Sequence, residues 1–148
     1  SDSEAHQAII SEEVKPGDVV VVRYVGPVGA PGMVEIMEAT EAIVNLGLDE
    51  SVALITDGRF SGFCHGPIIG HVSPEAAIGG PIALVEDGDI IEIDIENRSL
   101  KLDVSEEELA RRRQALVLPE PRVKKGFMRT YAKNCLPPER GAAMQAWD

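Results

Sequence analysis

The chain has 148 residues, of which 44% are hydrophobic and 26% charged, a composition typical of one folded soluble domain. Its 14 basic and 25 acidic residues give a net charge of −11, which excludes nucleic acid as an expected partner because phosphates are also negative. No apolar run approaches the roughly 20 residues of a membrane helix, so we expect no membrane association. Two cysteines, Cys64 and Cys135, are too few for a disulfide framework or a four-thiolate metal site within this chain.

The chain begins at Ser1 without an initiating methionine and without the character of a targeting signal. It also has no internal repeat and no low-complexity segment. We therefore expect residues 1–148 to be a single domain cut from a longer cytoplasmic polypeptide.

The N-terminal part of the chain predicts a helix followed by a strand. Apolar residues at helical spacing predict a short helix within residues 1–10, with Ser3 as its N-cap. The β-branched residues of 19–25 predict a buried strand. Three glycines and two prolines within residues 26–32 would interrupt a helix or strand, so this segment is expected to be a loop.

A second helix and a second strand are predicted next. Apolar residues recur at helical spacing over 33–46, and Gly47 stands where a glycine commonly ends a helix. The apolar run 51–55 predicts a strand that is buried on both faces. Residues 56–80 contain six glycines and are longer than an ordinary connection, which favours a functional loop.

Shorter elements are predicted between residues 73 and 104. Ser73 as N-cap and Pro74 as the first helical residue predict a brief helical turn. Three strands are expected to follow, the first two joined by a hairpin turn at Asp87-Gly88: 82–85, 90–95 and 99–104.

The C-terminal third predicts two more helices. Ser105 and Glu108 form the pattern of a capping box for a helix that reaches Leu116. Residues 119–148 form a tail with four prolines and one short predicted helix, 127–132. The whole set of elements predicts an α/β or α+β domain in which helices flank a mixed sheet or a small β-barrel.

The main candidate for a ligand site is the loop directly after the strand at 51–55. Asp57, Gly58, Arg59 and Gly62 follow the carboxyl end of this strand, where open α/β sheets bind ligands. The glycines would let backbone N–H groups approach an anion, and Arg59 would pair with a carboxylate or phosphate. The alternative is a tight turn in which Asp57 accepts hydrogen bonds from backbone N–H groups and Arg59 pairs with a surface acid.

Ser61, Cys64, His65 and His71 raise two further hypotheses, a nucleophilic serine and a metal site. Ser61 lacks the G-x-S-x-G frame of a hydrolase, and the cysteine and histidines lack the spacing of a structural zinc site. Each histidine is therefore expected to be solvated or bound to backbone.

Glu35 lies at the start of the second predicted helix. A carboxylate at this position commonly stabilises the helix dipole. It is also a suitable ligand for Mg²⁺, which prefers oxygen donors, and both interpretations stay open at this point.

Three segments resemble the carboxy-terminal domain of the dihydroxy-acid dehydratase family, which also includes phosphogluconate and sugar-acid dehydratases. The resemblance extends from Lys15 to the predicted helix that contains Arg113. The segments that carry it are Val52-Ala53-Leu54-Ile55-Thr56-Asp57-Gly58-Arg59-Phe60-Ser61-Gly62, Gly70-His71-Val72-Ser73-Pro74-Glu75-Ala76 and Gly79-Gly80-Pro81-Ile82-Ala83-Leu84.

The resemblance implies a swivelling β/β/α domain that closes over an amino-terminal domain of the same polypeptide. That domain would hold an iron–sulfur cluster and most Mg²⁺ ligands, and the full-length enzyme would be a homodimer. By resemblance, Ser61 is the proton acceptor, Glu35 completes the Mg²⁺ site and the tail 119–148 is divergent.

The implied activity is a hydro-lyase reaction of branched-chain amino acid biosynthesis, in which a 2,3-dihydroxy acid becomes a 2-oxo acid. The isolated chain would be inactive. Two alternatives stay open: a sugar-acid or phosphogluconate dehydratase domain, and a stand-alone binding module that has the fold without the chemistry.

Overall fold

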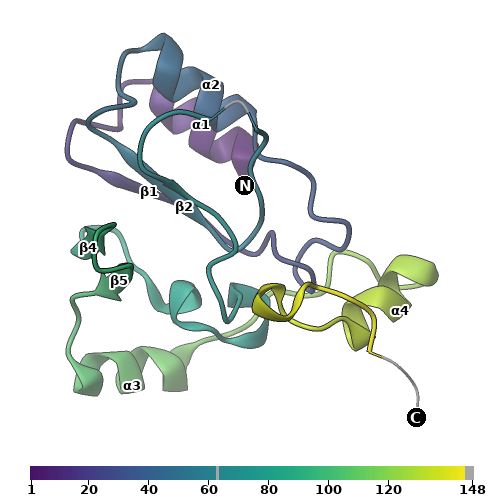
Figure 1. Ribbon diagram of the computed structural model, residues 1–148. Helices are drawn as coiled ribbons and strands as arrows, with labels where there is room; N and C mark the ends of the chain where they lie inside the picture. The colour runs from purple at the N-terminus through teal and green to yellow at the C-terminus, as the bar shows by residue number, and fades with distance from the viewer. Residues whose placement is uncertain (63, 146–148) are drawn as a thin grey trace.

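Two small β-sheets and four α-helices make up the computed structural model, which describes residues 1–62 and 64–145 (Figure 1). The last three residues of the predicted tail lie outside the described part. One sheet is parallel, with the order β1-β2-β3: β1 Val19–Val22, β2 Ala53–Thr56 and β3 Ile68–Ile69. The other is an antiparallel hairpin: β4 Ile91–Asp94 and β5 Ser99–Leu102.

Four α-helices and three 3₁₀ turns accompany the strands among the described residues. The α-helices are α1 Asp2–Ile10, α2 Glu38–Asn45, α3 Glu106–Ala115 and α4 Phe127–Asn134. Three short 3₁₀ turns complete the elements: η1 Ala76–Ile78, η2 Pro81–Leu84 and η3 Pro138–Arg140. Within the described residues no helix is both long enough and apolar enough to cross a membrane.

Helices α1 and α2 lie side by side against one face of the parallel sheet (Figure 1). Side chains alternate across a strand, so Val20 and Val22 face this helical layer and Val21 faces the opposite side. The larger core is formed where the layers meet, chiefly by Ala5, Ile9, Val22, Ala39, Ala42, Ile43, Val52 and Leu54. A smaller core on the opposite side joins Val21 and Tyr24 to Ala76, Ile82 and Ala83.

The first helix is confirmed, but its predicted N-cap is wrong. The Ser1 side chain accepts a hydrogen bond from the Glu4 backbone N–H at 3.3 Å, and the Glu4 carboxylate binds the Ser1 amine at 2.6 Å. This reciprocal capping box starts the helix at Asp2, so Ser3 lies inside the first turn.

Helix α2 begins at Glu38, five residues later than its apolar spacing predicts. The Asp2 carboxylate of α1 accepts hydrogen bonds from Met37 N and Ala39 N at 3.2 and 3.0 Å, which satisfies amides of the first turn. The predicted end is confirmed: Gly47 has φ +66° and donates to Val44 O, while Leu48 donates to Ile43 O, the two bonds of a Schellman motif.

The long segment 56–80 contains one element that the sequence analysis did not predict, because β3 lies within it and pairs with β2. The predicted helical turn is present as η1, but its N-cap is Glu75 and the Ser73–Pro74 bond is cis. The prediction that Ser73 caps this turn and Pro74 begins it is therefore wrong.

The predicted strand at 82–85 is wrong, because these residues form most of η2. The Ile82, Ala83 and Val85 carbonyls all accept hydrogen bonds from the Arg23 guanidinium, at 3.2, 3.0 and 2.8 Å. Carbonyls that converge on one cation cannot alternate outward as they do in a strand.

Consequently the predicted hairpin at Asp87-Gly88 is also wrong, and the hairpin turn lies between β4 and β5 instead. The class α/β is confirmed. The sheets are separate among the described residues, so the expected single mixed sheet or closed small barrel is not formed there.

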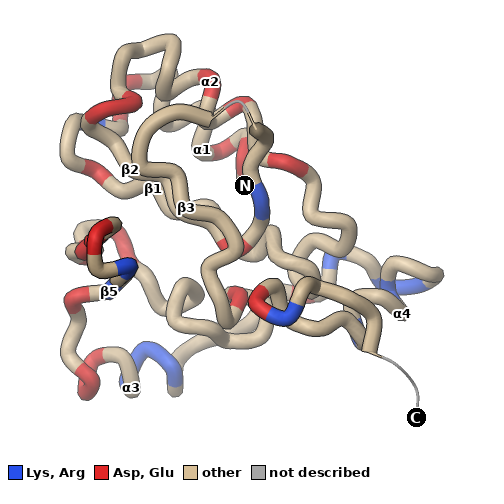
Figure 2. The backbone as a smooth tube through the Cα atoms, in the orientation of Figure 1, with Lys and Arg blue, Asp and Glu red and all other residues tan. Residues whose placement is uncertain are grey.

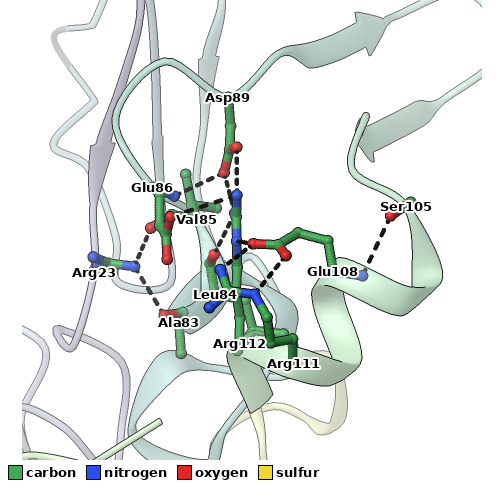
Figure 3. Close-up of polar contacts among 10 residues, drawn as sticks. All are labelled: Arg23, Ala83, Leu84, Val85, Glu86, Asp89, Ser105, Glu108, Arg111 and Arg112. Carbon is green, nitrogen blue, oxygen red and sulfur yellow. Dashed lines mark hydrogen bonds and ion pairs between the residues drawn. The ribbon is translucent and has the colours of Figure 1, made fainter. Parts of the chain in front are cut away.

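Helix α3 is confirmed, with Ser105 as its N-cap, and Arg112 attaches it to η2 and to the turn before β4 (Figure 3). The Arg112 guanidinium donates to Leu84 O at 3.0 Å and pairs with the Asp89 carboxylate at 2.6 Å. The Glu108 carboxylate binds Arg112 at 2.9 Å and Arg111 at 2.5 Å, so it does not complete the expected capping box. No residue of α3 is fully buried, which leaves these polar contacts as its main attachment.

Helix α4 confirms the short helix predicted in the tail and continues two residues further, to Asn134. Figure 2 shows basic residues on α3, α4 and the neighbouring tail, whereas α1 and α2 carry only acidic charge in their terminal turns. Residues 1–98 have 18 acidic and 4 basic side chains, a net charge of −14, whereas residues 99–148 have 7 acidic and 10 basic, a net charge of +3. The negative charge therefore lies in the first two thirds of the chain.

Candidate functional site

The segments that carry Glu35 and Ser61 lie side by side in the structure. Ile36 forms an isolated parallel bridge with Phe60: Ile36 N donates to Arg59 O at 2.9 Å, and Ser61 N donates to Ile36 O at 3.4 Å. Ile36 is buried in the larger core, so the bridge is anchored from below. The fold thus places side by side the segments that carry the two residues that the resemblance assigns to Mg²⁺ binding and proton transfer.

Arg59 connects the two segments through its side chain. Its Nη1 lies 3.4 Å from Glu35 Oε1, and its Nε donates to Met33 O at 2.5 Å. Both Arg59 and Glu35 are about half exposed, 46% and 50%, so the pair stands at the surface. A half-exposed carboxylate such as that of Glu35 suits a metal-ligating role, because Mg²⁺ commonly takes one or two protein carboxylates.

Ser61 lies in the loop between Gly58 and Gly62. The Ser61 side chain is 9% exposed, and a Cβ added at Gly62 would meet no atom within 4 Å. At Gly58 a Cβ would come within 2.8 Å of Val25 Cγ2 and 2.9 Å of Val25 O, so this position requires glycine. The loop is therefore tightly packed at Gly58 and open at Gly62.

The Asp57 carboxylate is fully buried beneath the loop. It accepts hydrogen bonds from Tyr24 N at 3.1 Å, Val25 N at 3.0 Å and Ala76 N at 2.8 Å. These bonds end β1 at Val22, three residues earlier than the apolar pattern predicts, because the next amides turn toward Asp57. The tight-turn interpretation expected Asp57 to accept backbone hydrogen bonds and Arg59 to pair with a surface acid, and both contacts are present. Anion binding by the loop stays a prediction.

Glu75 is a second buried carboxylate, at a position that no motif in the sequence marks as a site residue. Its side chain is 0% exposed and accepts hydrogen bonds from Val28 N and Gly29 N, each at 2.9 Å. Burial raises the pKa of Glu75 above its ordinary value, the two amide hydrogen bonds lower it, and the charge of Asp57 raises it further. No local sequence signal could have shown this role, because Val28 is 47 residues away along the chain.

Cys64, His65 and His71 do not form a site with one another in the described part of the chain. Cys64 and His65 are exposed, and His71 has φ +58° and donates its N–H to Gly58 O at 2.9 Å. Among residues 1–62 and 64–145, no three His, Cys, Asp or Glu side chains are placed to hold a metal ion. Cys64 and Cys135 therefore do not fit an iron–sulfur cluster held by this chain.

The profile of one protein family, described as dihydroxy-acid/6-phosphogluconate dehydratase C-terminal, matches residues 1–142. The chain belongs to this family. The match includes every residue of the site, and the expected family resemblance is confirmed over almost the whole chain.

Curated relatives of this dehydratase domain carry the name dihydroxy-acid dehydratase. The protein of Moorella thermoacetica is 57% identical over 98% of this chain, and that of Syntrophotalea carbinolica is 56% identical over 99%. The protein of a Synechococcus strain is 54% identical over all of it, tail included. In each case the chain spans 26% of the relative, about a quarter of its length.

Proposed function

We propose that this chain is the carboxy-terminal domain of a hydro-lyase that converts a 2,3-dihydroxy acid to a 2-oxo acid in branched-chain amino acid biosynthesis. One observation carries the proposal: the similarity to curated dihydroxy-acid dehydratases, 53–57% identical, extends along the whole chain. The substrate is a small molecule, and the partner is an amino-terminal domain of the same polypeptide. The full-length enzyme is a cytoplasmic homodimer in this proposal.

Ser61 is the proposed base. Dehydration removes a proton from C2 and the hydroxyl from C3, and the resulting enol tautomerises to the 2-oxo acid. Ser61 Oγ, as the alkoxide, accepts the C2 proton. A serine hydroxyl has a pKa far above neutral, so the alkoxide needs positive potential, which in this proposal comes from Arg59, two residues before Ser61, and from nearby backbone N–H groups.

Glu35 is the proposed Mg²⁺ ligand of this chain, and its carboxylate would exchange its Arg59 partner for the cation. When bound, Mg²⁺ would hold the substrate oxygens and make the C2 proton more acidic. The other ligands would come from the amino-terminal domain, as would all ligands of the iron–sulfur cluster, since Cys64 and Cys135 are not placed for one.

The proposal is tested on the full-length enzyme with 2,3-dihydroxyisovalerate, 6-phosphogluconate and a sugar acid as substrates. We expect turnover of the first. Ser61→Ala should lower kcat by about 10²- to 10⁴-fold, the usual contribution of a positioned base. Glu35→Gln should raise the Mg²⁺ concentration needed for half-maximal activity.

Matched controls are Ser99→Ala and Glu41→Gln, which remove the same groups from exposed positions in β5 and α2. Both should leave activity unchanged. Preferred turnover of 6-phosphogluconate or the sugar acid would replace the substrate assignment. Wild-type rates in Ser61→Ala and Glu35→Gln would reject the two roles, and an inactive full-length protein would favour the non-catalytic module.

A further inference from the structure

Asp57 and Glu75 are two buried carboxylates whose hydrogen bonds, within the described part of the chain, come from backbone amides. Each side chain is 0% exposed, and a buried carboxylate is costly unless its oxygens are hydrogen-bonded. The structure satisfies both residues with amides from one segment, 24–29, and with the amide of Ala76. Such an arrangement makes the shape of that segment depend on these two side chains.

The two carboxylates act on opposite ends of the segment. Asp57, at the end of β2, holds Tyr24 N and Val25 N, while Glu75 holds Val28 N and Gly29 N. Asp57 also holds Ala76 N, the residue after Glu75, at 2.8 Å. The carboxylates are therefore linked to each other through the backbone as well as through the segment that they both bind.

Close packing leaves no room for a side chain at Gly26, next to both residues of the pair. A Cβ on Gly26 would lie 2.7 Å from Glu75 Oε2 and 3.0 Å from Asp57 O. The backbone of Glu75 is fixed in turn by Gly80, whose N–H donates to Glu75 O at 3.0 Å. Gly80 also passes so near Pro74 O that a Cβ there would lie 1.7 Å from it.

A continuous set of hydrogen bonds leads from this segment to Glu35. Ala30 N donates to Gly26 O and Met33 N to Ala30 O, each at 2.8 Å. Met33 O then accepts from Arg59, whose guanidinium also pairs with Glu35. On the other side Asp57 lies four residues before Ser61 in the same loop.

We propose that Asp57 and Glu75 are positioning residues, a buried carboxylate clamp that fixes the place of Glu35 relative to Ser61. This inference rests on the proposed function, because only there do Glu35 and Ser61 act on the same substrate. The clamp touches neither substrate nor metal. It acts by holding the 24–29 segment, from which the chain leads to Glu35, against the loop that carries Ser61.

Protonation of Glu75 would weaken the clamp, because a protonated carboxyl offers fewer acceptor sites to Val28 N and Gly29 N. The charged group that acts on Glu75 is Asp57, from the loop after β2. Tyr131 and Cys135, at the end of α4, are neighbours whose pKa values are raised chiefly by burial and further by the charge of Glu75. Glu75→Gln reproduces the protonated state at every pH, since one of its two acceptor oxygens becomes an amide donor.

The test measures kcat, KM and unfolding temperature of the full-length enzyme from acid to neutral pH. Glu75→Gln should lower kcat by about ten- to a hundredfold, the loss that follows a displacement of about 1 Å, and leave KM within about twofold. Its kcat should also lack the fall on the acid side that the wild type shows as Glu75 takes up a proton. The control is Asp89→Asn, which removes another hydrogen-bonded carboxylate, the partner of Arg112 outside the site.

The outcomes separate this inference from the proposed function. A wild type without dehydratase activity contradicts the proposed function, whatever the clamp does. The clamp is overturned by a different result. In that result the wild type is active and Ser61→Ala is impaired, but Glu75→Gln has a kcat no lower than that of Asp89→Asn when the two variants have equal unfolding temperatures.

A second measurement covers the case in which Glu75→Gln does not fold. In the wild-type enzyme, hydrogen exchange of the Val28 and Gly29 amides should be slow at neutral pH and should accelerate, beyond its chemical trend, as kcat falls in acid. Exchange as fast as that of an open loop at neutral pH overturns the proposal without any variant.

Discussion

Gly26 shows how closely the chain packs against the buried carboxylates. We expect Gly26→Ala to destabilise the domain by about 1–3 kcal/mol, the range for overpacking, since its Cβ would lie 2.7 Å from Glu75 Oε2. Gly70→Ala is the matched control, because the atoms nearest to its added Cβ lie at 3.5 Å, an ordinary contact. Urea unfolding followed by circular dichroism measures both, and equal midpoints would contradict the packing argument.

At the residue scale, the sequence predicted the kinds of contact that Asp57 and Arg59 make, but not the distant residues that pack beneath them. The tight-turn interpretation anticipated that Asp57 would accept backbone hydrogen bonds and that Arg59 would pair with an acid. It could not identify the donors, since Val25 lies 32 residues from Asp57. Glu75 was overlooked because its neighbourhood reads as the start of a helical turn, and its partners come from a distant loop.

At the scale of elements, α3 depends on charge for its place in the fold. Arg111 and Arg112 hold the pKa of Glu108 at about 2, below its ordinary 4.5. Because the pKa of Glu108 is lower in the folded state, its ion pairs with the two arginines stabilise the fold above pH 4.5. This contribution is lost as the pH falls toward about 2.

We therefore expect the unfolding temperature of the wild type to fall more steeply in this pH window than that of Glu108→Gln, which has no charge to lose. Glu107→Gln, a change on an exposed neighbour in the same helix, should keep the wild-type slope. If the unfolding temperatures of the wild type and Glu108→Gln fall in parallel with pH, the ion pairs of Glu108 do not stabilise the fold.

Elements were predictable from sequence where local signals decided them. Ser105 as N-cap and the Gly47 helix end are set by side chains and backbone within one turn, and both were confirmed. The α2 start and the 82–85 segment were wrong because distant groups decide them, the Asp2 carboxylate in one case and the Arg23 guanidinium in the other. Apolar periodicity does not contain that information.

At the scale of the whole molecule, the isolated chain should fold but not catalyse. Among the described residues, no group of three metal-ligating side chains comes together, and Glu35 alone is a weak Mg²⁺ ligand. We expect a cooperative thermal transition by circular dichroism, no saturable Mg²⁺ binding by calorimetry and no dehydration of 2,3-dihydroxyisovalerate. The full-length enzyme is the positive control, and turnover by the isolated chain would contradict the division of ligands proposed above.

The overall class was predictable because the alternation of apolar runs and helical patterns in the first 55 residues is strong. The arrangement of the strands was not. Whether five short strands form one sheet, a barrel or two sheets depends on which edges meet, and the sequence marks edges only weakly. Residues 82–85 were expected to be the strand that connects the two halves of a single sheet, and they form most of a 3₁₀ turn instead.

The parallel pairing of β1 with β2 has a consequence for how the domain reaches its native state. Val19 pairs with Ala53, so the ladder forms only after a long intervening loop, which includes α2, has closed. Loop closure must precede such distant contacts, which makes them late and slow steps of folding. Glu35 lies inside that loop and Ser61 lies beyond its end, so we expect the contact between their segments to become stable together with this ladder.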